Sequence, residues 1–241
     1  MKIAFNVMAV VFVATAFSGC TQYREYQVNV TSYLSRAHAL PTDGARVHLR
    51  VQTDLKEPLL EMEVAAKVRA LVIREGFEVA DQCESDYVLR TFFTIDNGHT
   101  ETGVRPVYSP GGTSYSTVHT GSGQYATVTT QNPGTTTYVP YAETYFVRYL
   151  KMELYKKDQL EACLAAQKDE KEKDLSSAIV WSSTTTSAGS SSDLRSVIDY
   201  LLVVTFDYFG RDTGQRKSLS IYENDKRVSA MRQTVAENGQ P

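Results

Sequence analysis

The sequence lacks the motifs by which many enzymes and nucleic-acid-binding proteins are identified. No cluster of lysine and arginine interleaved with aromatic residues occurs, and the formal net charge is −3, so the chain lacks the basic footprint that nucleic-acid binding needs. No H-E-x-x-H, G-x-S-x-G or CxxC sequence is present, nor is a phosphate-binding loop or a dinucleotide fingerprint. The sequence therefore predicts no catalytic residues, no metal site, no cofactor and no nucleic-acid partner.

Long apolar segments are also scarce. The run "IAFNVMAVVFVATAF", which follows Lys2, has about fifteen residues and is shorter than the ~20 residues of a transmembrane helix. A charged start, an apolar middle and small residues at the end are the layout of a secretory signal. No later segment is as apolar over that length, so we expect no membrane span in the mature chain.

The apolar run ends in "FSGC", where Cys20 follows two small residues. This segment resembles the lipobox of bacterial lipoproteins, although Phe17 stands where leucine is commonest. The resemblance implies that residues 1–19 are a cleaved signal peptide and that Cys20 carries lipid on its sulfur and its amino group. Several acyl chains together anchor a protein stably in a membrane. Because Thr21 rather than aspartate follows, we expect delivery to the periplasmic face of the outer membrane; the alternative is an incidental cysteine after an ordinary signal.

Hydrophobic periodicity in the rest of the chain predicts one domain of the α/β class, α+β type, over residues 26–222, after a tether at 20–25. The predicted strands lie near residues 28–35, 45–53, 86–96, 143–158, 177–189 and 217–223, and the two main helices at 58–75 and 193–209. The strand–helix–strand order at the start resembles small periplasmic lipoproteins of diderm bacteria, many without known activity. We expect a two-layer sandwich in which both helices cover one face of a mostly antiparallel sheet.

Three segments are assigned no place in this sheet. Residues 159–174 carry mixed charges and are predicted to form a short exposed helix or a solvated loop. Residues 223–241 are predicted to be a polar tail. Residues 98–141 are a low-complexity insertion, because no charged side chain occurs between Pro106 and Ala142.

The insertion has two interpretations. It could be a mobile loop or a poorly packed hairpin between the strands at 86–96 and 143–158. It could instead be a contact arm whose tyrosines stack on sugars or bind a protein partner. The tyrosines in question are Tyr108, Tyr115, Tyr125, Tyr138 and Tyr141. An uncharged β-arm tends to aggregate, so we expect it to be covered or paired.

Two cysteines remain if Cys20 is acylated. An even number of cysteines in an exported chain favours a disulfide, and Cys83 and Cys163 flank two strands that are predicted to pair. The alternative is two buried free thiols.

The function that these features favour is a lipid-anchored cell-envelope protein acting as a non-catalytic binding or assembly module. Its partners would be the membrane, through the lipid on Cys20, and an envelope protein or polysaccharide. An accessory cell-wall enzyme and a purely structural envelope lipoprotein are the alternatives; a cleft with converging carboxylates or histidines would favour the enzyme.

Overall fold

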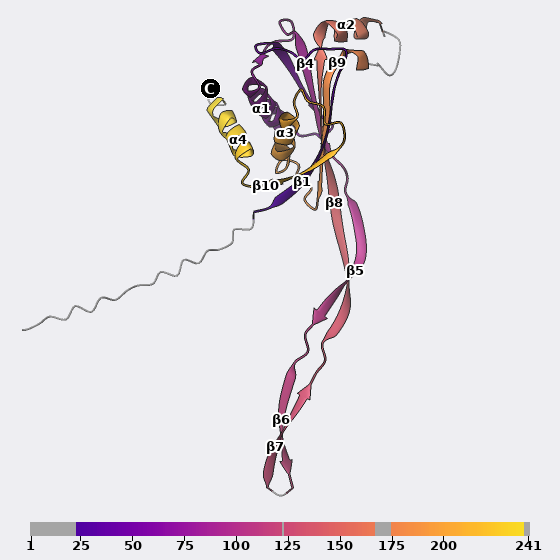
Figure 1. Ribbon diagram of the computed structural model, residues 1–241, viewed down its shortest axis with the longest axis vertical. Helices are drawn as coiled ribbons and strands as arrows, with labels where there is room; N and C mark the ends of the chain where they lie inside the picture. The colour runs from indigo at the N-terminus through magenta and orange to yellow at the C-terminus, as the bar shows by residue number, and fades with distance from the viewer. Residues whose placement is uncertain (1–22, 122, 167–174, 239–241) are drawn as a thin grey trace, which may run out of the picture.

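A computed structural model describes residues 23–121, 123–166 and 175–238 of the protein. It shows a domain of helices and strands from which one long hairpin projects (Figure 1). In chain order the described elements are β1 (Glu25–Leu34), β2 (Arg46–Thr53), α1 (Pro58–Arg74), β3 (Glu78–Val79), β4 (Tyr87–Ile95), β5 (His99–Ser109), β6 (Thr113–Thr120), β7 (Gln124–Gln131), β8 (Thr135–Lys156), α2 (Lys157–Ala166), a 3-10 turn (Ser176–Ala178), β9 (Ile179–Gly189), α3 (Ile198–Asp207), β10 (Lys217–Tyr222) and α4 (Lys226–Asn238).

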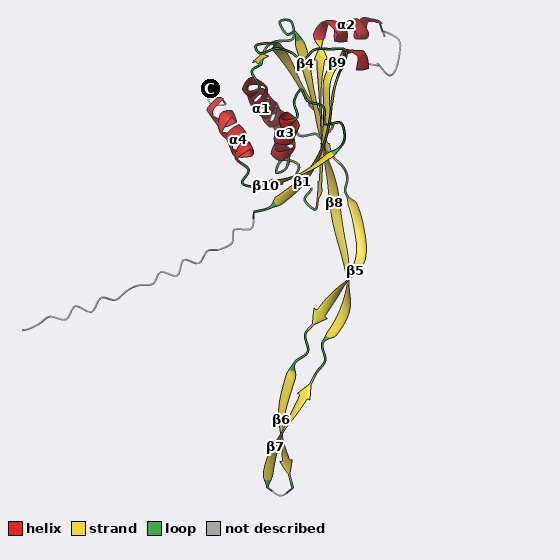
Figure 2. Cartoon of the chain, in the orientation of Figure 1, coloured by secondary structure: helices red, strands yellow, loops and turns green. Residues whose placement is uncertain are grey.

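The main sheet has the strand order β10-β1-β9-β8-β4-β2-β3, and the α+β class is confirmed (Figure 2). The predicted antiparallel pairing of the strands at 86–96 and 143–158 is also confirmed, since β4 pairs with β8 in that direction. The sheet is nevertheless mixed, because β2 runs parallel to both β4 and β3. The reason is that α1 carries the chain back across the sheet after β2, and such a crossover returns the next strand in the same direction.

The core lies between the sheet and the helices α1, α3 and α4, which stand on one side of it (Figure 1). Alternate residues of each strand point into this core, such as Leu150, Met152 and Leu154 of β8. The helix predicted at 58–75 is confirmed: it begins at Pro58, and after its last turn Gly76 takes a positive φ of 88°.

The second predicted helix begins later than expected. Its α-helical part starts at Ile198 rather than 193, after a turn in which Leu194 O accepts hydrogen bonds from the amides of Val197 and Ile198. Asp193 Oδ1 accepts a hydrogen bond from the amide of Ser196 at 3.3 Å, so Asp193, and not Ser192, caps this turn.

The predicted polar tail is wrong, because residues 226–238 form α4. Its Val228 and Met231 are buried in the core, only 0% and 3% exposed. Two ion pairs hold it in place: Arg232 Nε lies 2.6 Å from Asp199 Oδ2, and Arg227 bridges Asp225 and Asp207. The partners of these arginines include α3, which lies more than twenty residues earlier in the chain.

The opposite face of the sheet is largely open. Helix α2 covers only one end of it, where Leu160 and Cys163 pack on Val88 and Tyr155. The predicted short helix in this region is therefore present, although it is partly buried; residues 167–174 of the predicted segment lie outside the described residues.

Candidate functional site

The insertion at 98–141 forms an extended hairpin that we call the arm, residues 99–145. Its shaft is β5 paired with the first half of β8, from His99 opposite Tyr145 to Ser109 opposite Thr135, and its tip is β6 paired with β7. The arm stands clear of the domain (Figures 1 and 2). Residues 99–120 of one edge correspond to about 70 Å of strand at the usual rise of ~3.3 Å per residue. The interpretation as a paired hairpin is thus correct, and the loop interpretation is wrong.

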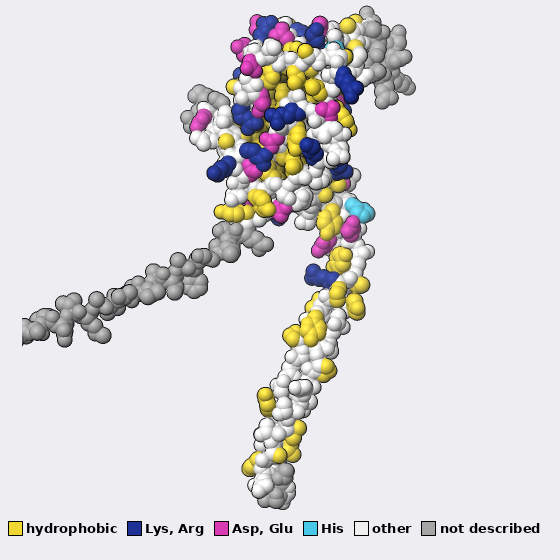
Figure 3. All heavy atoms as spheres, viewed as in Figure 1, with side chains coloured by type: hydrophobic (Ala, Val, Ile, Leu, Met, Phe, Trp, Pro, Cys, Tyr) yellow, Lys and Arg dark blue, Asp and Glu magenta, His cyan; other side chains and the backbone are white. Residues whose placement is uncertain are grey.

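Both edges of the arm are open. Strand β5 pairs only with β8, and β8 is joined to β9 only from Phe146 onward. Charged side chains colour the domain in Figure 3, whereas the arm beyond its base shows only uncharged and apolar groups. Natural proteins usually protect such edges with charge, proline or a covering segment. The arm has none of the first from Pro106 to Ala142, so its backbone donors and acceptors remain available to another strand.

The five predicted tyrosines all lie on the arm but not on one face. At the tip, Tyr115 and Tyr125 share a face with His119, whose ring meets that of Tyr125 at 5.1 Å, and both tyrosines are more than 70% exposed. On the shaft, Tyr108 and Tyr138 share one face and are also exposed.

Tyr141 differs from the other four because it is half-buried. It stands opposite Gly103, and a Cβ at Gly103 would lie 2.9 Å from its ring. An aromatic ring over a cross-strand glycine stabilises a hairpin, so Tyr141 supports the shaft and the other four tyrosines are available for contact.

The arm is continuous with the centre of the domain. Strand β8 has 22 residues; its second half lies between β4 and β9, with Leu150 opposite Phe93 on one side and Thr185 on the other. The arm therefore has no hinge loop between it and the sheet on the β8 side, although β5 joins β4 through a turn at Asp96 to Gly98. Asp96 Oδ1 accepts hydrogen bonds from Val147 and Gly98 and so fixes this turn.

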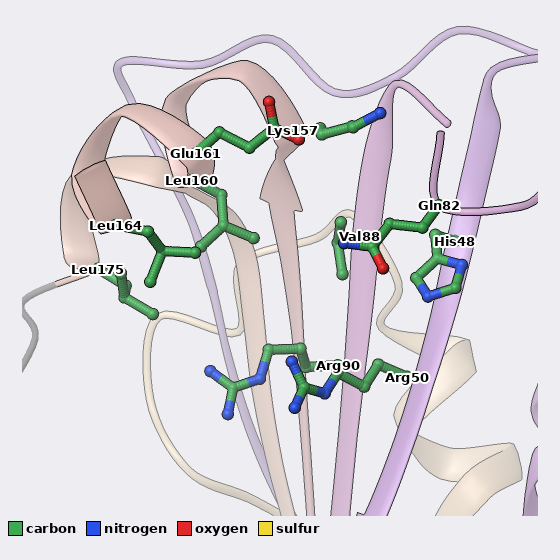
Figure 4. A pocket seen from close by; sticks show the side chains of 10 residues that line it. All are labelled: His48, Arg50, Gln82, Val88, Arg90, Lys157, Leu160, Glu161, Leu164 and Leu175. Atoms are coloured by element: carbon green, nitrogen blue, oxygen red, sulfur yellow. The ribbon is translucent and has the colours of Figure 1, made fainter. Parts of the chain in front are cut away.

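A second feature is a cleft on the open face of the sheet, beside α2 (Figure 4). Its volume is about 280 Å³. Four aliphatic side chains and four basic ones line it, with one amide and one carboxylate: Val88, Leu160, Leu164, Leu175, His48, Arg50, Arg90, Lys157, Gln82 and Glu161.

The cleft carries an excess of positive charge. Arg50 and Arg90 stand directly opposite each other on β2 and β4, and Figure 4 shows their guanidinium groups together at one end. Neither is in an ion pair with any described residue; Arg90 lies 5.8 Å from the ring of Tyr155, whose pKa is raised by burial and by its hydrogen bond to Glu153. Like charges on adjacent strands repel, so this cleft suits a ligand with an apolar part and an anionic group.

The cleft does not bring together an acid–base pair. His48 and Glu161 lie on opposite sides of it, with Glu161 close to Lys157 (Figure 4). His48 is half-buried, its Nδ1 3.4 Å from Ala80 O, which corrects the expectation of a plain surface residue. The sequence analysis missed the cleft; the one available signal was the pattern of basic residues on alternate positions of the strands at 45–53 and 86–96.

The predicted disulfide is absent, since both thiols are free within the described residues. Cys163 lies on α2 with its Sγ 3.2 Å from Ser177 Oγ, facing the small apolar cluster. Cys83 is exposed in the turn before β4, where its carbonyl accepts a hydrogen bond from Lys157. The alternative of two buried thiols is also wrong for Cys83.

The predicted signal peptide at 1–19, Cys20 and the start of the tether lie outside the described residues. Over the part of the chain that the structure describes, no helix is long and apolar enough to cross a membrane, and no group of three metal-ligating side chains occurs.

Comparisons with known proteins give no family. No family model and no curated protein matches the chain. Among solved structures, a PDZ domain protein from Parabacteroides distasonis aligns with 82% of this chain at 11% identity and a TM-score of 0.37, and the chain spans only 39% of that protein. A PelC dodecamer from Paraburkholderia phytofirmans aligns with 76% of this chain and 99% of its own at 14% identity and a TM-score of 0.36. A PelC variant from the same organism gives 72%, 91%, 16% and 0.33. These likenesses are weak, and no function follows from them.

Proposed function

We propose that the protein is a lipid-anchored module of a bacterial cell envelope that binds another protein chain through its arm and catalyses no reaction. In this proposal the domain is a two-layer scaffold, the acylated Cys20 holds it at the periplasmic face of the outer membrane, and the arm reaches the partner.

The observation that carries the binding role is the pair of open, uncharged edges along the arm. A partner strand added to either edge would satisfy the free backbone groups of β5 or β8, and this mode of recognition is common among proteins that bind extended segments. The exposed rings of Tyr108, Tyr115, Tyr125 and Tyr138 add flat apolar surface with a polar tip, which protein interfaces favour. A polysaccharide could use the rings but not the backbone edges, so a protein partner fits more of the arm.

The anchor rests on the lipobox resemblance at Cys20 and on where the domain begins. Arg24 follows Cys20 by four residues, and the described chain enters the sheet at β1. The register Val28–Ser187–Arg148 places the start of β1 at the end of the sheet from which the arm leaves. Anchor and arm thus extend from the same end, so the arm would work close to the membrane surface.

A photo-crosslinking amino acid at the arm tip tests the binding role. With the probe at position 115 or 125, irradiation of cells that express the full-length protein should give one discrete protein adduct on a denaturing gel. The matched control carries the probe at Tyr222, which is 49% exposed on β10 in the domain, and should not give that adduct. Identical adducts at all three positions, or none at the tip, contradict the proposal.

A truncated arm separates contact from folding. Replacing residues 103–141 by Asn-Gly keeps the pair Thr102–Ala142 and closes the shaft with a two-residue turn. The arm contacts only itself beyond its base, so the melting temperature should stay within a few degrees of that of the wild-type protein while co-purification of the crosslinked partner is lost. Exchange of exposed arm threonines for serine is the control that should retain the partner. Unchanged capture by the truncated protein would leave only a structural role.

Intact mass spectrometry tests the anchor. Protein extracted from the membrane fraction should have a mass that begins at Cys20 plus the mass of the acyl groups, and Cys20→Ala should abolish both processing and lipid attachment. A mass that lacks lipid would refute the anchor and would leave the arm experiment unaffected.

A further inference from the structure

A small pocket lies where the arm meets the domain, at the end of the sheet where β1 begins. It has a volume of about 220 Å³ and is bounded by the first residues of β1, by β8 at Arg148, and by the segment that leaves β9 at Gly189 to Ser191. The pocket belongs neither to the cleft beside α2 nor to the exposed surface of the arm. We call it the Arg148 pocket.

Arg148 is a buried cation without a counter-ion. Its residue is 2% exposed, and one terminal nitrogen donates a hydrogen bond to Ser191 O. The Nε is buried and has no hydrogen-bond partner among the described residues, and none of their carboxylates lies within ion-pair distance. Burial lowers the pKa of Arg148, yet a guanidinium remains charged at neutral pH. Such a charge is costly unless something pairs with it.

A second cation faces the same pocket. Side chains alternate along β1, and the buried Val28 places Arg24 and Tyr26 on the face that carries Arg148. Arg24 is exposed and lies 6.0 Å from the ring of Tyr26. Glu25 also borders the pocket, but its carboxylate accepts a hydrogen bond from Gln27 at 2.6 Å, on the other face of the strand. The acceptor-facing side of the pocket thus holds two positive charges.

The nearest other carboxylates are engaged elsewhere. Asp96 Oδ1 accepts from two backbone amides, and Asp193 Oδ1 accepts from the amide of Ser196. The wall opposite Arg148 is built to leave its guanidinium room: a Cβ at Gly189 would lie 3.0 Å from one terminal nitrogen. Ser190, with no hydrogen-bond partner for its hydroxyl among the described residues, lies beside it. The pocket therefore offers donors and positive charge and lacks an acceptor for them.

We propose that the Arg148 pocket binds the phosphate group of a membrane lipid headgroup. Arginine pairs with phosphate through two parallel hydrogen bonds, which Nε and a terminal nitrogen can supply together. The lipid source follows from position and rests on the proposed anchor: four residues separate Arg24 from Cys20, so the pocket opens within about 14 Å of the acylated residue at ~3.5 Å per residue. A headgroup phosphate at the membrane surface lies within that reach, and its binding would fix the orientation of the domain and of the arm.

The test uses the mature acylated protein in a nonionic detergent and measures its melting temperature with and without added ligand. The probes are dihexanoyl phosphatidylglycerol and, separately, inorganic phosphate. Phosphatidylglycerol should raise the melting temperature of the wild-type protein by several degrees, because a ligand that binds only the folded state stabilises it. Arg148→Met should abolish this rise, and Arg24→Gln should weaken binding about tenfold, as expected for loss of a charged hydrogen bond. Arg211→Gln, which removes an exposed arginine in the loop after α3, is the matched control and should behave like the wild-type protein.

The ligand-free Arg148→Met protein gives an independent readout. If the arginine serves a ligand, removing its unpaired buried charge should leave the melting temperature unchanged or raise it; a marked fall would assign Arg148 a structural role and overturn the proposal. An equal rise with inorganic phosphate would overturn the lipid assignment. No rise with either probe, or a rise that survives both substitutions, would overturn the site; Arg24→Gln keeps the test valid if Arg148→Met does not fold. Because intact mass and arm crosslinking are measured on the same samples, failure of the anchor or of the arm is distinguishable from failure of this pocket.

Discussion

Replacing Asp199 with alanine is expected to destabilise the domain by about 3–5 kcal/mol, the usual cost of removing one partner from a buried ion pair. Asp199 lies on α3 with its side chain 3% exposed, and its two oxygens pair with Lys67 of α1 at 2.5 Å and with Arg232 of α4 at 2.6 Å. Arg232 is half-exposed and can return to water. Lys67 is 7% exposed and would stay buried beside the new cavity, so most of the loss comes from Lys67.

The substitutions Lys67→Met and Lys67→Met/Asp199→Ala are the controls. In the Lys67→Met protein, Asp199 keeps Arg232, and Glu63 keeps Arg195 of the turn before α3, so the loss should be smaller than in Asp199→Ala. The double variant has no buried lysine to strand and should be more stable than Asp199→Ala alone. Urea denaturation followed by far-ultraviolet circular dichroism measures all three; a loss below about 1 kcal/mol for Asp199→Ala would mean that the buried lysine is easily rehydrated.

The same network sets a dependence on pH. Burial favours the neutral carboxyl of Glu63, but hydrogen bonds and charge from Lys67 and Arg195 outweigh it and hold the pKa of Glu63 below its ordinary value of 4.5. A carboxyl with a lowered folded-state pKa adds stability above its ordinary pKa, and that stability is lost as the pH falls through the folded-state value. The loss caused by Asp199→Ala should therefore be measured near neutral pH, where the whole network is charged.

Replacing Trp181 with alanine should cost about 3–5 kcal/mol, as for other large buried aromatic residues. Trp181 is fully buried on β9, its ring lies 4.7 Å from that of Phe209, and its Nε1 donates hydrogen bonds to Ser32 Oγ at 2.7 Å and to Tyr208 O at 3.1 Å. It thus joins β1, β9 and the segment after α3.

Trp181→Phe separates packing from hydrogen bonding. The phenyl ring keeps much of the volume but leaves Ser32 and Tyr208 without their donor, so we expect about 1–3 kcal/mol, the range for an unsatisfied buried group. Circular dichroism is again the measurement, because the chain has a single tryptophan and the variants lose its fluorescence. Equal losses for alanine and phenylalanine would show that the hydrogen bonds, rather than the ring, dominate.

The elements that could be predicted from sequence are those whose signal is local. Helix α1 shows apolar periodicity over many residues, a proline at its start and Gly76 at its end, and it lies where the pattern places it. Helix α4 could not be predicted, since only Val228 and Met231 of its face are deeply buried and its other restraints are ion pairs to distant residues. The parallel pairing of β2 likewise depends on the path of α1 across the sheet and on no local pattern.

The candidate sites follow the same division. The arm could be located from its missing charge and its tyrosines, but not its pairing, because a strand of repeated threonine, serine and glycine specifies its register weakly. The Arg148 pocket and the cleft beside α2 could not be predicted. Each is assembled from segments more than a hundred residues apart, and the property that marks each, a cation without a partner, exists only after folding.

The continuity of β8 has a mechanical consequence. A pull on the arm tip would pass along one covalent strand into the middle of the sheet, where residues 146–156 are hydrogen-bonded to β9 on one side and largely to β4 on the other. Those hydrogen bonds are perpendicular to the strand, so the force would strain many of them at once in shear rather than open them one after another. A domain joined to the membrane at one point and to a partner at the arm tip could in this way transmit tension between the two without unfolding.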